Sequence, residues 1–285
     1  MAEPPLDPLY FNDYPWEIRA ADWAQQAPSP FTSTNAAAIR RVAQDVRVVV
    51  NVGPVALLAL LRGEPYVNTY ERALVGGDHG PSNVRERVDA AVGISGPDTY
   101  FGALAVSGVG VRYYGEYCLV LDIDAIDDSP GLFDRDTYEI EYPPFAGRTD
   151  RDRLIAQMRA QWDERQHLLL LKVLPTLKSE HRPASTGVLA SAVLTDQDFV
   201  EVHMRPDRRS LAAGCFELAS VNEVRLDPVD LALADWLSTR WSDAELLTDE
   251  EMAFIRQRDD VQTGLARAGT RVRVIGGAAG GTRWP

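Results

Sequence analysis

Cysteine is scarce in this sequence, and long apolar runs are absent. The two cysteines, Cys118 and Cys215, each lie in an apolar, strand-like context, so we predict buried thiols in a reducing compartment and no disulfide framework. No apolar run is long enough to span a bilayer, and the acidic, proline-rich start of the chain lacks the basic flank and apolar core of a secretory signal. We therefore expect a cytoplasmic protein without a membrane partner.

The motifs of several enzyme classes are also missing. The glycines within 276–281 are not followed by Lys and Ser or Thr, and no Gly-x-Gly-x-x-Gly follows a strand, which argues against a phosphate-binding loop. The four histidines lack metalloprotease spacing, and no serine has the flanking glycines of a nucleophile elbow. The acidic run at 122–141 offers oxygen ligands without the spacing of a calcium-binding loop, so we predict no metal site.

The charge balance is strongly acidic in an otherwise ordinary globular composition. Of the 285 residues, 45% are hydrophobic and 25% are charged, and the formal net charge is −13. This charge argues against broad binding to nucleic acid or to an anionic membrane. A local basic cluster remains at Arg205, Arg208 and Arg209, although such clusters usually form a solvated face.

The stretch from residue 47 to residue 72 combines three backbone patterns. The β-branched residues at 47–52 predict a strand, which Gly53 and Pro54 end while presetting a first helical turn over 55–61. Gly63 fits the left-handed position after that helix. The polar segment 66–71 then either lines a cleft through aromatic and amide groups or forms an ordinary half-exposed strand.

The rest of the chain alternates between helical and strand patterns. We expect helices at 82–92, 151–174, 229–239 and 249–258, strands at 137–142, 199–204, 221–226 and 271–275, and a hairpin of strands at 100–106 and 111–121. These elements predict one mixed α+β domain. We divide it into an N-terminal arm with helices at 1–45, a core at 46–228, C-terminal helices at 229–275 that complete the core, and a flexible tail at 276–285.

Glu201 is the carboxylate that the pattern singles out. In the strand 199–204, period-two alternation places Glu201 and His203 on one face and apolar residues on the other. A carboxylate within an apolar strand costs desolvation free energy unless it faces a cleft. The alternative is that Glu201 lies on the solvent face of an edge strand.

A succession of short blocks, at 50–52, 66–71, 100–104, 114–121 and 199–203, resembles a poorly characterised family of bacterial proteins. That family is similar to the ADP-ribosyltransferase superfamily of toxins. The resemblance covers roughly residues 46–225. It implies an α+β fold with a split pair of small β-sheets surrounded by helices, and NAD bound as a substrate in the cleft between the sheets.

The resemblance also implies roles for four residues. Asn51 would occupy the first-strand position that holds the nicotinamide ribose or amide, and Tyr66 or Tyr70 would stack on the nicotinamide. Glu201, on a late strand, would hydrogen-bond the ribose 2′-hydroxyl as the catalytic carboxylate. Cleavage of the nicotinamide–ribose bond passes through an oxocarbenium-like state, which a nearby carboxylate stabilises.

Four further residues would support the bound NAD. Asn68, Thr69 and Glu71 would make polar contacts, and Arg112 would pair with the pyrophosphate. The sequence departs from the superfamily pattern at the first strand, where Asn51 replaces the usual Arg or His. It also lacks a Glu-x-Glu pair that ends at Glu201, and the Glu-x-Glu at 139–141 does not fit the block order.

The leading functional hypothesis is therefore an NAD-dependent mono-ADP-ribosyltransferase-like enzyme, a bacterial toxin or effector that modifies a macromolecular target. An antitoxin or immunity protein would be its neutralising partner. The alternatives are an NAD glycohydrolase, in which water replaces the target, and a non-catalytic module that binds a ligand or protein.

Overall fold

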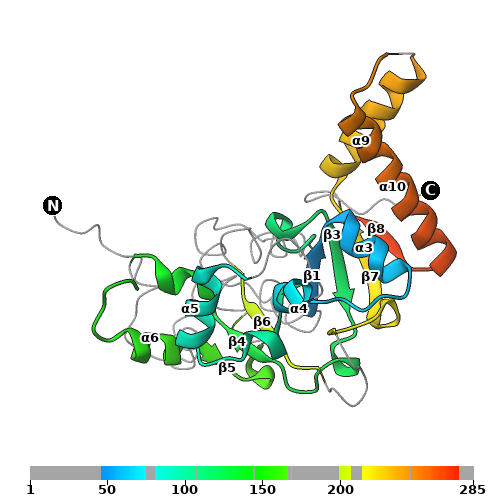
Figure 1. The fold of residues 1–285 in the computed structure, drawn as a ribbon. Helices are drawn as coiled ribbons and strands as arrows, with labels where there is room; N and C mark the ends of the chain where they lie inside the picture. The colour runs from blue at the N-terminus through cyan, green and yellow to red at the C-terminus, as the bar shows by residue number, and fades with distance from the viewer. Residues whose placement is uncertain are drawn as a thin grey trace, which may run out of the picture.

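The structure is a computed structural model, and it describes residues 46–74, 81–106, 108–143, 145–165, 168, 199–206, 214–243 and 245–275. The predicted N-terminal arm, the predicted tail and most of 166–198 lie outside the described residues. The chain within these ranges is a mixture of helices and strands, as the sequence predicts (Figure 1).

Among the described residues, eight strands form one sheet in the order β5-β4-β6-β2-β1-β3-β7-β8. All neighbouring pairs are antiparallel except β7 and β8, which are parallel. In chain order the strands are β1 (Arg47–Val52), β2 (Tyr100–Ala105), β3 (Tyr117–Leu121), β4 (Gly131–Phe133), β5 (Arg159–Ala160), β6 (Glu201–Met204), β7 (Val221–Leu226) and β8 (Val272–Val274).

The helices in the described ranges lie against both faces of this sheet or beside it. The α-helices are α3 (Pro54–Leu61), α4 (Thr69–Leu74), α5 (Asn83–Ala91), α6 (Arg151–Met158), α9 (Pro228–Ser242) and α10 (Asp249–Ala268). The 3-10 helices are η1 (Gly96–Asp98), η2 (Arg112–Tyr114), η3 (Ile123–Ala125), η4 (Thr137–Glu141), η5 (Trp162–Glu164) and η6 (Leu218–Ser220).

Local sequence signals explain where several helices begin and end. Pro54 lies in the first turn of α3, and Gly63 after it has a φ of 84°. Ser82 caps α5, because its hydroxyl accepts a hydrogen bond from the backbone N–H of Arg85 at 3.1 Å. Thr248 caps α10 in the same way. These boundaries agree with the sequence-based expectations for 55–61 and 82–92.

The sheet parts between its two central strands. β1 pairs with β2 only over residues 47–49, up to Val49 opposite Ala103, and then continues with β3 over 49–52. β2 instead continues with β6 over 100–103. The last half of β1 and the first half of β2 therefore diverge. Within the described ranges all strands belong to one continuous sheet with an opening between β1 and β2, rather than to the two separate small sheets that the resemblance implies.

Three apolar clusters cover the sheet. The main core joins one face to α3 and α10, where Leu57, Leu60, Val261 and Leu265 are buried. A second cluster on the opposite face holds Val49, Ala103, Ala105, Val111, Cys118, Val120 and Phe199. A third cluster packs α5, η4 and α6 around Phe133, with Val88, Val92, Ile140, Phe145, Ile155 and Met158. The opening between β1 and β2 lies where these three clusters meet.

Three sequence-based expectations about the core are wrong. Strands β2 and β3 do not form a hairpin, because β1 lies between them and pairs with both. The segment 137–142 is the 3-10 helix η4, which Asp136 caps by accepting a hydrogen bond from the N–H of Tyr138. The helix predicted from residue 151 ends at Met158, where the chain turns into β5.

The helices α9 and α10 form a hairpin that extends away from the sheet (Figure 1). α10 packs on α3, whereas the outer face of α9 carries exposed apolar side chains at Val229, Leu233 and Trp236. Within the part of the chain that the structure describes, no helix combines the length and apolar character needed to cross a bilayer.

Candidate functional site

A cavity of about 430 Å³ occupies the opening between β1 and β2. This volume falls within the range of about 300–1,000 Å³ that small-molecule pockets have. Val50 and Asn51 are consecutive residues of β1 and both line it, as Phe101 and Gly102 of β2 do. Successive side chains of a strand point to opposite faces of the sheet. One cavity can contact consecutive residues of β1 and of β2 because these two strands stop pairing here and separate. We call this space the central cavity.

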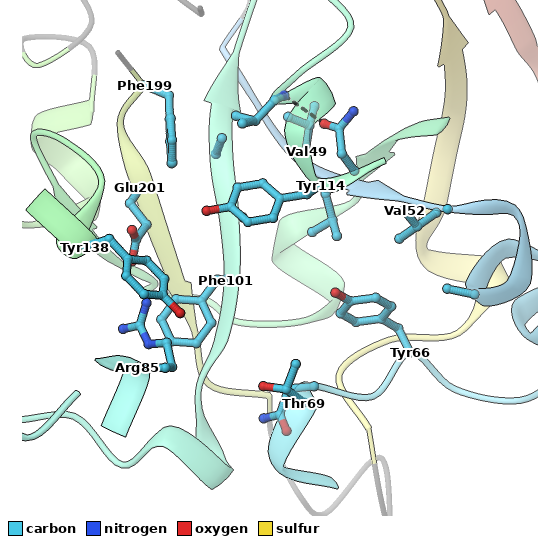
Figure 2. A pocket seen from close by; sticks show the side chains of 18 of the residues that line it. Val49, Val52, Tyr66, Thr69, Arg85, Phe101, Tyr114, Tyr138, Phe199 and Glu201 are labelled. Atoms are coloured by element: carbon cyan, nitrogen blue, oxygen red, sulfur yellow. Dashed lines mark hydrogen bonds between the residues drawn. The ribbon is translucent and has the colours of Figure 1, made fainter. Parts of the chain in front are cut away.

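The other residues that line the central cavity come from seven segments of the chain. They are Val49, Val52, Gly53, Ala56, Tyr66, Asn68, Thr69, Arg72, Pro81, Ser82, Arg85, Ala103, Val111, Tyr114, Tyr138, Phe199 and Glu201. Figure 2 shows Glu201, Tyr138, Arg85 and Phe101 on one side and Tyr66, Thr69 and Val52 on the other, with the Tyr114 ring between them. The cavity thus has a charged side and an aromatic and apolar side.

On the aromatic side, Tyr66 is held in a fixed orientation. Its ring stacks on Phe216 with centroids 4.9 Å apart and planes 14° apart, and the Arg72 guanidinium lies 5.9 Å from the Tyr66 centroid. The backbone N–H of Tyr66 also donates to the Phe216 carbonyl at 2.8 Å. A ring fixed in this way offers a preorganised surface for a flat ligand.

On the charged side, Glu201 is a buried carboxylate whose two oxygens are both hydrogen-bonded. The backbone N–H of Thr137 donates to Oε2 at 2.9 Å, and its hydroxyl donates to Oε1 at 2.9 Å. The Nε2 atom of His203 lies 2.5 Å from Oε1. Glu201 is 4% exposed and His203 is 3% exposed. The solvent-exposed alternative for Glu201 is therefore wrong.

Arg85 brings a buried guanidinium group to this side. Its guanidinium carbon lies 4.1 Å from the centroid of Phe101 and 5.0 Å from that of Tyr138. Its Nε atom donates to Asp89 at 2.5 Å, and Nη1 donates to the hydroxyl of Thr137 at 3.3 Å. α5 therefore delivers a positive charge that is fixed by its own carboxylate and stacked between two rings.

These contacts separate the protonation behaviour of two neighbouring carboxyl groups. Burial opposes ionisation of Glu201, but the hydrogen bond and charge of His203, the charge of Arg85 and the Thr137 amide outweigh it, so the pKa of Glu201 lies below its usual value. Burial and then the adjacent charge of Glu201 raise the pKa of Asp136 to about 7. Near neutral pH the site therefore holds an ionised Glu201 beside a carboxyl group that titrates.

Tyr114 faces the same carboxylates from η2. Its hydroxyl is directed toward Glu201 (Figure 2). Burial and then the charges of Asp136 and Glu201 raise the pKa of Tyr114. The phenol is thus a neutral hydroxyl at the centre of the cavity, able to donate or accept a hydrogen bond.

Asn51 lines the central cavity, but the structure places its amide group in a structural role. The side-chain nitrogen donates to the carbonyls of Val109 and Gly115 at 2.9 Å each, and the side-chain oxygen accepts from the N–H of Val111 at 2.9 Å. These bonds hold the loop that carries Tyr114. Strand geometry points the backbone N–H and C=O of Asn51 the same way as those of Val49, toward the opening.

Asn68 and Thr69 lie where the polar segment 66–71 meets the cavity. The Asn68 side-chain nitrogen donates to the carbonyls of residues 96, 97 and 99, and its oxygen accepts from the N–H of Glu71, at the start of α4. The Asn68 side chain therefore joins the start of α4 to the segment 96–99 at the edge of the central cavity. Thr69 is exposed and presents its side chain to the opening. The segment is helical from Thr69, which neither a polar loop nor a strand predicts.

Three of the residues that the resemblance implies do not line the central cavity. The Tyr70 hydroxyl donates to Asp89 at 2.6 Å, so Tyr66 alone of the two tyrosines offers a ring to the cavity. Glu71 accepts hydrogen bonds from the Tyr100 hydroxyl and from the N–H of Gly214. Arg112 pairs with Asp230 of α9 at 2.5 Å. Each is committed to packing between elements.

The sequence patterns assign no role to several residues of the site. Arg85, Phe101, Tyr114 and Tyr138 line the cavity, and Thr137 anchors Glu201. Phe101 and Tyr114 lie within blocks of the resemblance but receive no role from it, and the other three lie outside the blocks. The one available signal is Arg85, an arginine on the otherwise apolar face of α5 with Val88 and Val92. An arginine on such a face needs a buried partner, and Asp89 one turn later supplies it.

In the described parts of the chain, no group of three or more His, Cys, Asp or Glu side chains is arranged to hold a metal ion. No protein-family model matches the sequence, and the search of curated proteins finds no similar chain.

Proposed function

We propose that the protein is an NAD-dependent mono-ADP-ribosyltransferase-like enzyme, a toxin or effector acting on a macromolecular target, with NAD bound in the central cavity. The observation that carries this proposal is Glu201. It is an ionised, rigidly held carboxylate on a late strand, and it shares one cavity with the first strand and with fixed aromatic rings. This is the arrangement that the resemblance implies for nicotinamide–ribose cleavage.

Each part of the cavity has a role in this proposal. Tyr66 offers its ring to the nicotinamide, and the backbone of Asn51, at the opening, suits the carboxamide. Glu201 accepts a hydrogen bond from the ribose and stabilises the positive charge that develops on the sugar. The bond between ribose C1′ and the nicotinamide nitrogen breaks with its electron pair leaving on nicotinamide. A nucleophile then bonds to C1′ and loses its proton.

The geometry supports NAD hydrolysis as a second candidate. Glu201 is 4% exposed and is flanked by Tyr114 and Tyr138, so the reacting carbon would lie deep in the cavity. Such depth admits water more readily than a side chain of a macromolecule. The two candidates share every step up to loss of nicotinamide and differ only in the nucleophile.

The test is nicotinamide release from NAD by the purified chain, with and without a cell lysate as a source of acceptor. We expect E201Q to release nicotinamide about 100-fold or more slowly than the wild type, because Gln keeps the size of the side chain but not the charge. E245Q is the matched control, since Glu245 is exposed in the loop between α9 and α10.

Transfer of label from NAD to a lysate component would support the transferase, and free ADP-ribose alone would support the glycohydrolase. Wild-type protein that neither binds NAD nor releases nicotinamide would contradict both proposals. A ligand-binding module without catalysis would then be the remaining explanation for the cavity.

A further inference from the structure

The residue next to Glu201 on the same face of β6 is a buried histidine. Residues 201 and 203 lie two positions apart in a strand, so both side chains point to the same face. His203 reaches back along the strand to place Nε2 2.5 Å from the Glu201 carboxylate. An ionised carboxylate only accepts hydrogen bonds, so the imidazole nitrogen is the donor.

The His203 ring has little freedom to leave this position. It packs edge-on against Phe101, with centroids 5.0 Å apart, and lies at an interplanar angle of 35° to Phe133, with centroids 4.6 Å apart. Phe101 lies directly opposite His203 in the register between β2 and β6. Two neighbouring strands therefore clamp the imidazole between aromatic rings, so its hydrogen bond holds Glu201 in one orientation.

Other charged and titratable groups also surround Glu201. Those that face it from the elements packed around it are Arg85 from α5, Asp136 and Tyr138 at η4, Tyr114 from η2 and His203 on β6 itself. Arg85 makes its direct ion pair with Asp89 rather than with Glu201. Asp136 and Tyr114 add no positive charge. Among these groups, His203 is the one whose nitrogen directly contacts the Glu201 carboxylate.

We propose that His203 is a positioning residue that orients the Glu201 carboxylate toward the central cavity and sustains its negative charge. This inference rests on the proposed function for its catalytic consequence. His203 itself does not line the central cavity. It lines a separate cavity of about 370 Å³ at the end of the sheet, with Asp127, Arg159 and Arg205. Its effect on NAD would therefore pass through Glu201.

The test compares H203L, which removes the donor and keeps an apolar side chain, with H203Q, which retains a side-chain N–H. We expect H203L to lower kcat for nicotinamide release about 10- to 100-fold with a smaller change in KM, because a misplaced catalytic group slows chemistry more than binding. H203Q should recover part of that loss. F133L is the control for packing, since it changes one ring contact of the imidazole but keeps the His203 donor itself.

The pH profile separates positioning from simple packing. His203 lowers the pKa of Glu201, so its loss lets burial raise that pKa. The acid limb of the kcat profile should therefore move to higher pH in H203L and stay in place in F133L. A profile that shifts equally in both variants, or in neither, would overturn the proposal.

A second readout does not depend on NAD. The side-chain carboxyl carbon of Glu201 is identified by ¹³C NMR as the resonance that E201Q lacks, and its titration midpoint is compared between wild type and H203L. A higher midpoint in H203L is the expected result, and an unchanged midpoint would contradict the inference. If the wild type released no nicotinamide, the proposed function would fail while this measurement still decided the role of His203.

Discussion

Two carboxylates occupy equivalent positions on the two halves of the sheet. Glu201 lies on β6 with His203 two residues on, and Glu223 lies on β7 with Arg225 two residues on. Both pairs are buried, with closest contacts of 2.5 Å and 2.7 Å. One row of the sheet connects the carboxylates through opposed residues: Glu201, Ala103, Val49, Val120 and Glu223.

The surroundings of the two carboxylates differ. Glu223 meets further cations at the edge of the sheet, with Arg271 at 3.3 Å and Arg273 at 3.7 Å, and does not line the central cavity. Glu201 faces that cavity together with aromatic rings. Burial and ion pairing are therefore common to both carboxylates and do not distinguish them. The two pairs differ in position: the opening between β1 and β2 lies beside Glu201 and not beside Glu223.

The largest effect on stability is expected at the pair without a cavity. E223A leaves Arg225 buried without its main partner, which we expect to cost about 3–5 kcal/mol of unfolding free energy. The measurement is urea denaturation at neutral pH. Nicotinamide release per folded molecule should match the wild type. A fully stable E223A protein, or a folded one without activity, would erase the distinction between the two pairs.

Asn51 tests whether the opening depends on the loop that covers it. N51A leaves the carbonyls of Val109 and Gly115 and the N–H of Val111 without their partner, and we expect a loss of about 2–3 kcal/mol in unfolding free energy. N222A is the matched control, because Asn222 is an exposed strand asparagine on β7. Equal stabilities of N51A and N222A would refute the anchoring role.

Gly102 tests how closely β1 and β2 approach each other at the edge of the opening. A Cβ atom there would lie 2.9 Å from the carbonyl oxygen of Val49, so G102A must push β1 and β2 apart, at an expected cost of about 1–2 kcal/mol. G131A on β4 is the control, since its Cβ would meet His203 at an ordinary 3.7 Å. Thermal unfolding of the two variants checks this prediction, and a G131A protein as unstable as G102A would contradict it.

The smallest effect is expected outside both halves of the sheet. Trp236 is 54% exposed on the outer face of α9, where it stacks with Arg240. W236S should therefore change the unfolding free energy by less than about 0.5 kcal/mol and leave nicotinamide release unchanged. A larger loss in chemical denaturation would show that α9 contributes more to the core than its contacts indicate.

The sequence predicts the parts of this fold that local signals control. The β-branched run at 47–52 and the Gly53-Pro54 break define β1 and α3, and alternation alone places Glu201 and His203 on one face. Strand partners are not local, so the adjacent strands at 100–106 and 111–121 misleadingly suggest a hairpin. The alternating residues at 137–142 suggest a strand, but Thr137 forms hydrogen bonds with Glu201 and the backbone turns instead.

The candidate site is predictable to a similar degree. Glu201, Asn51 and Tyr66 line the cavity, as the sequence blocks predict. Asn51 lies on β1, Glu201 lies on β6 and Tyr66 lies in the segment after α3. The role of the Asn51 side chain could not be found, since its partners lie 58 to 64 residues away. Arg85 reaches the site through rings on β2 and η4, which no spacing along the chain reveals.

The most direct test of the role proposed for Glu201 is nicotinamide release by wild type, E201Q and E223Q at saturating NAD, with each rate divided by the folded fraction. We expect E201Q to lose about 100-fold or more of the activity and E223Q to stay within about twofold of the wild type. Equal losses in the two variants, or full activity in E201Q, would contradict the claim that the cavity beside Glu201 makes it the functional carboxylate.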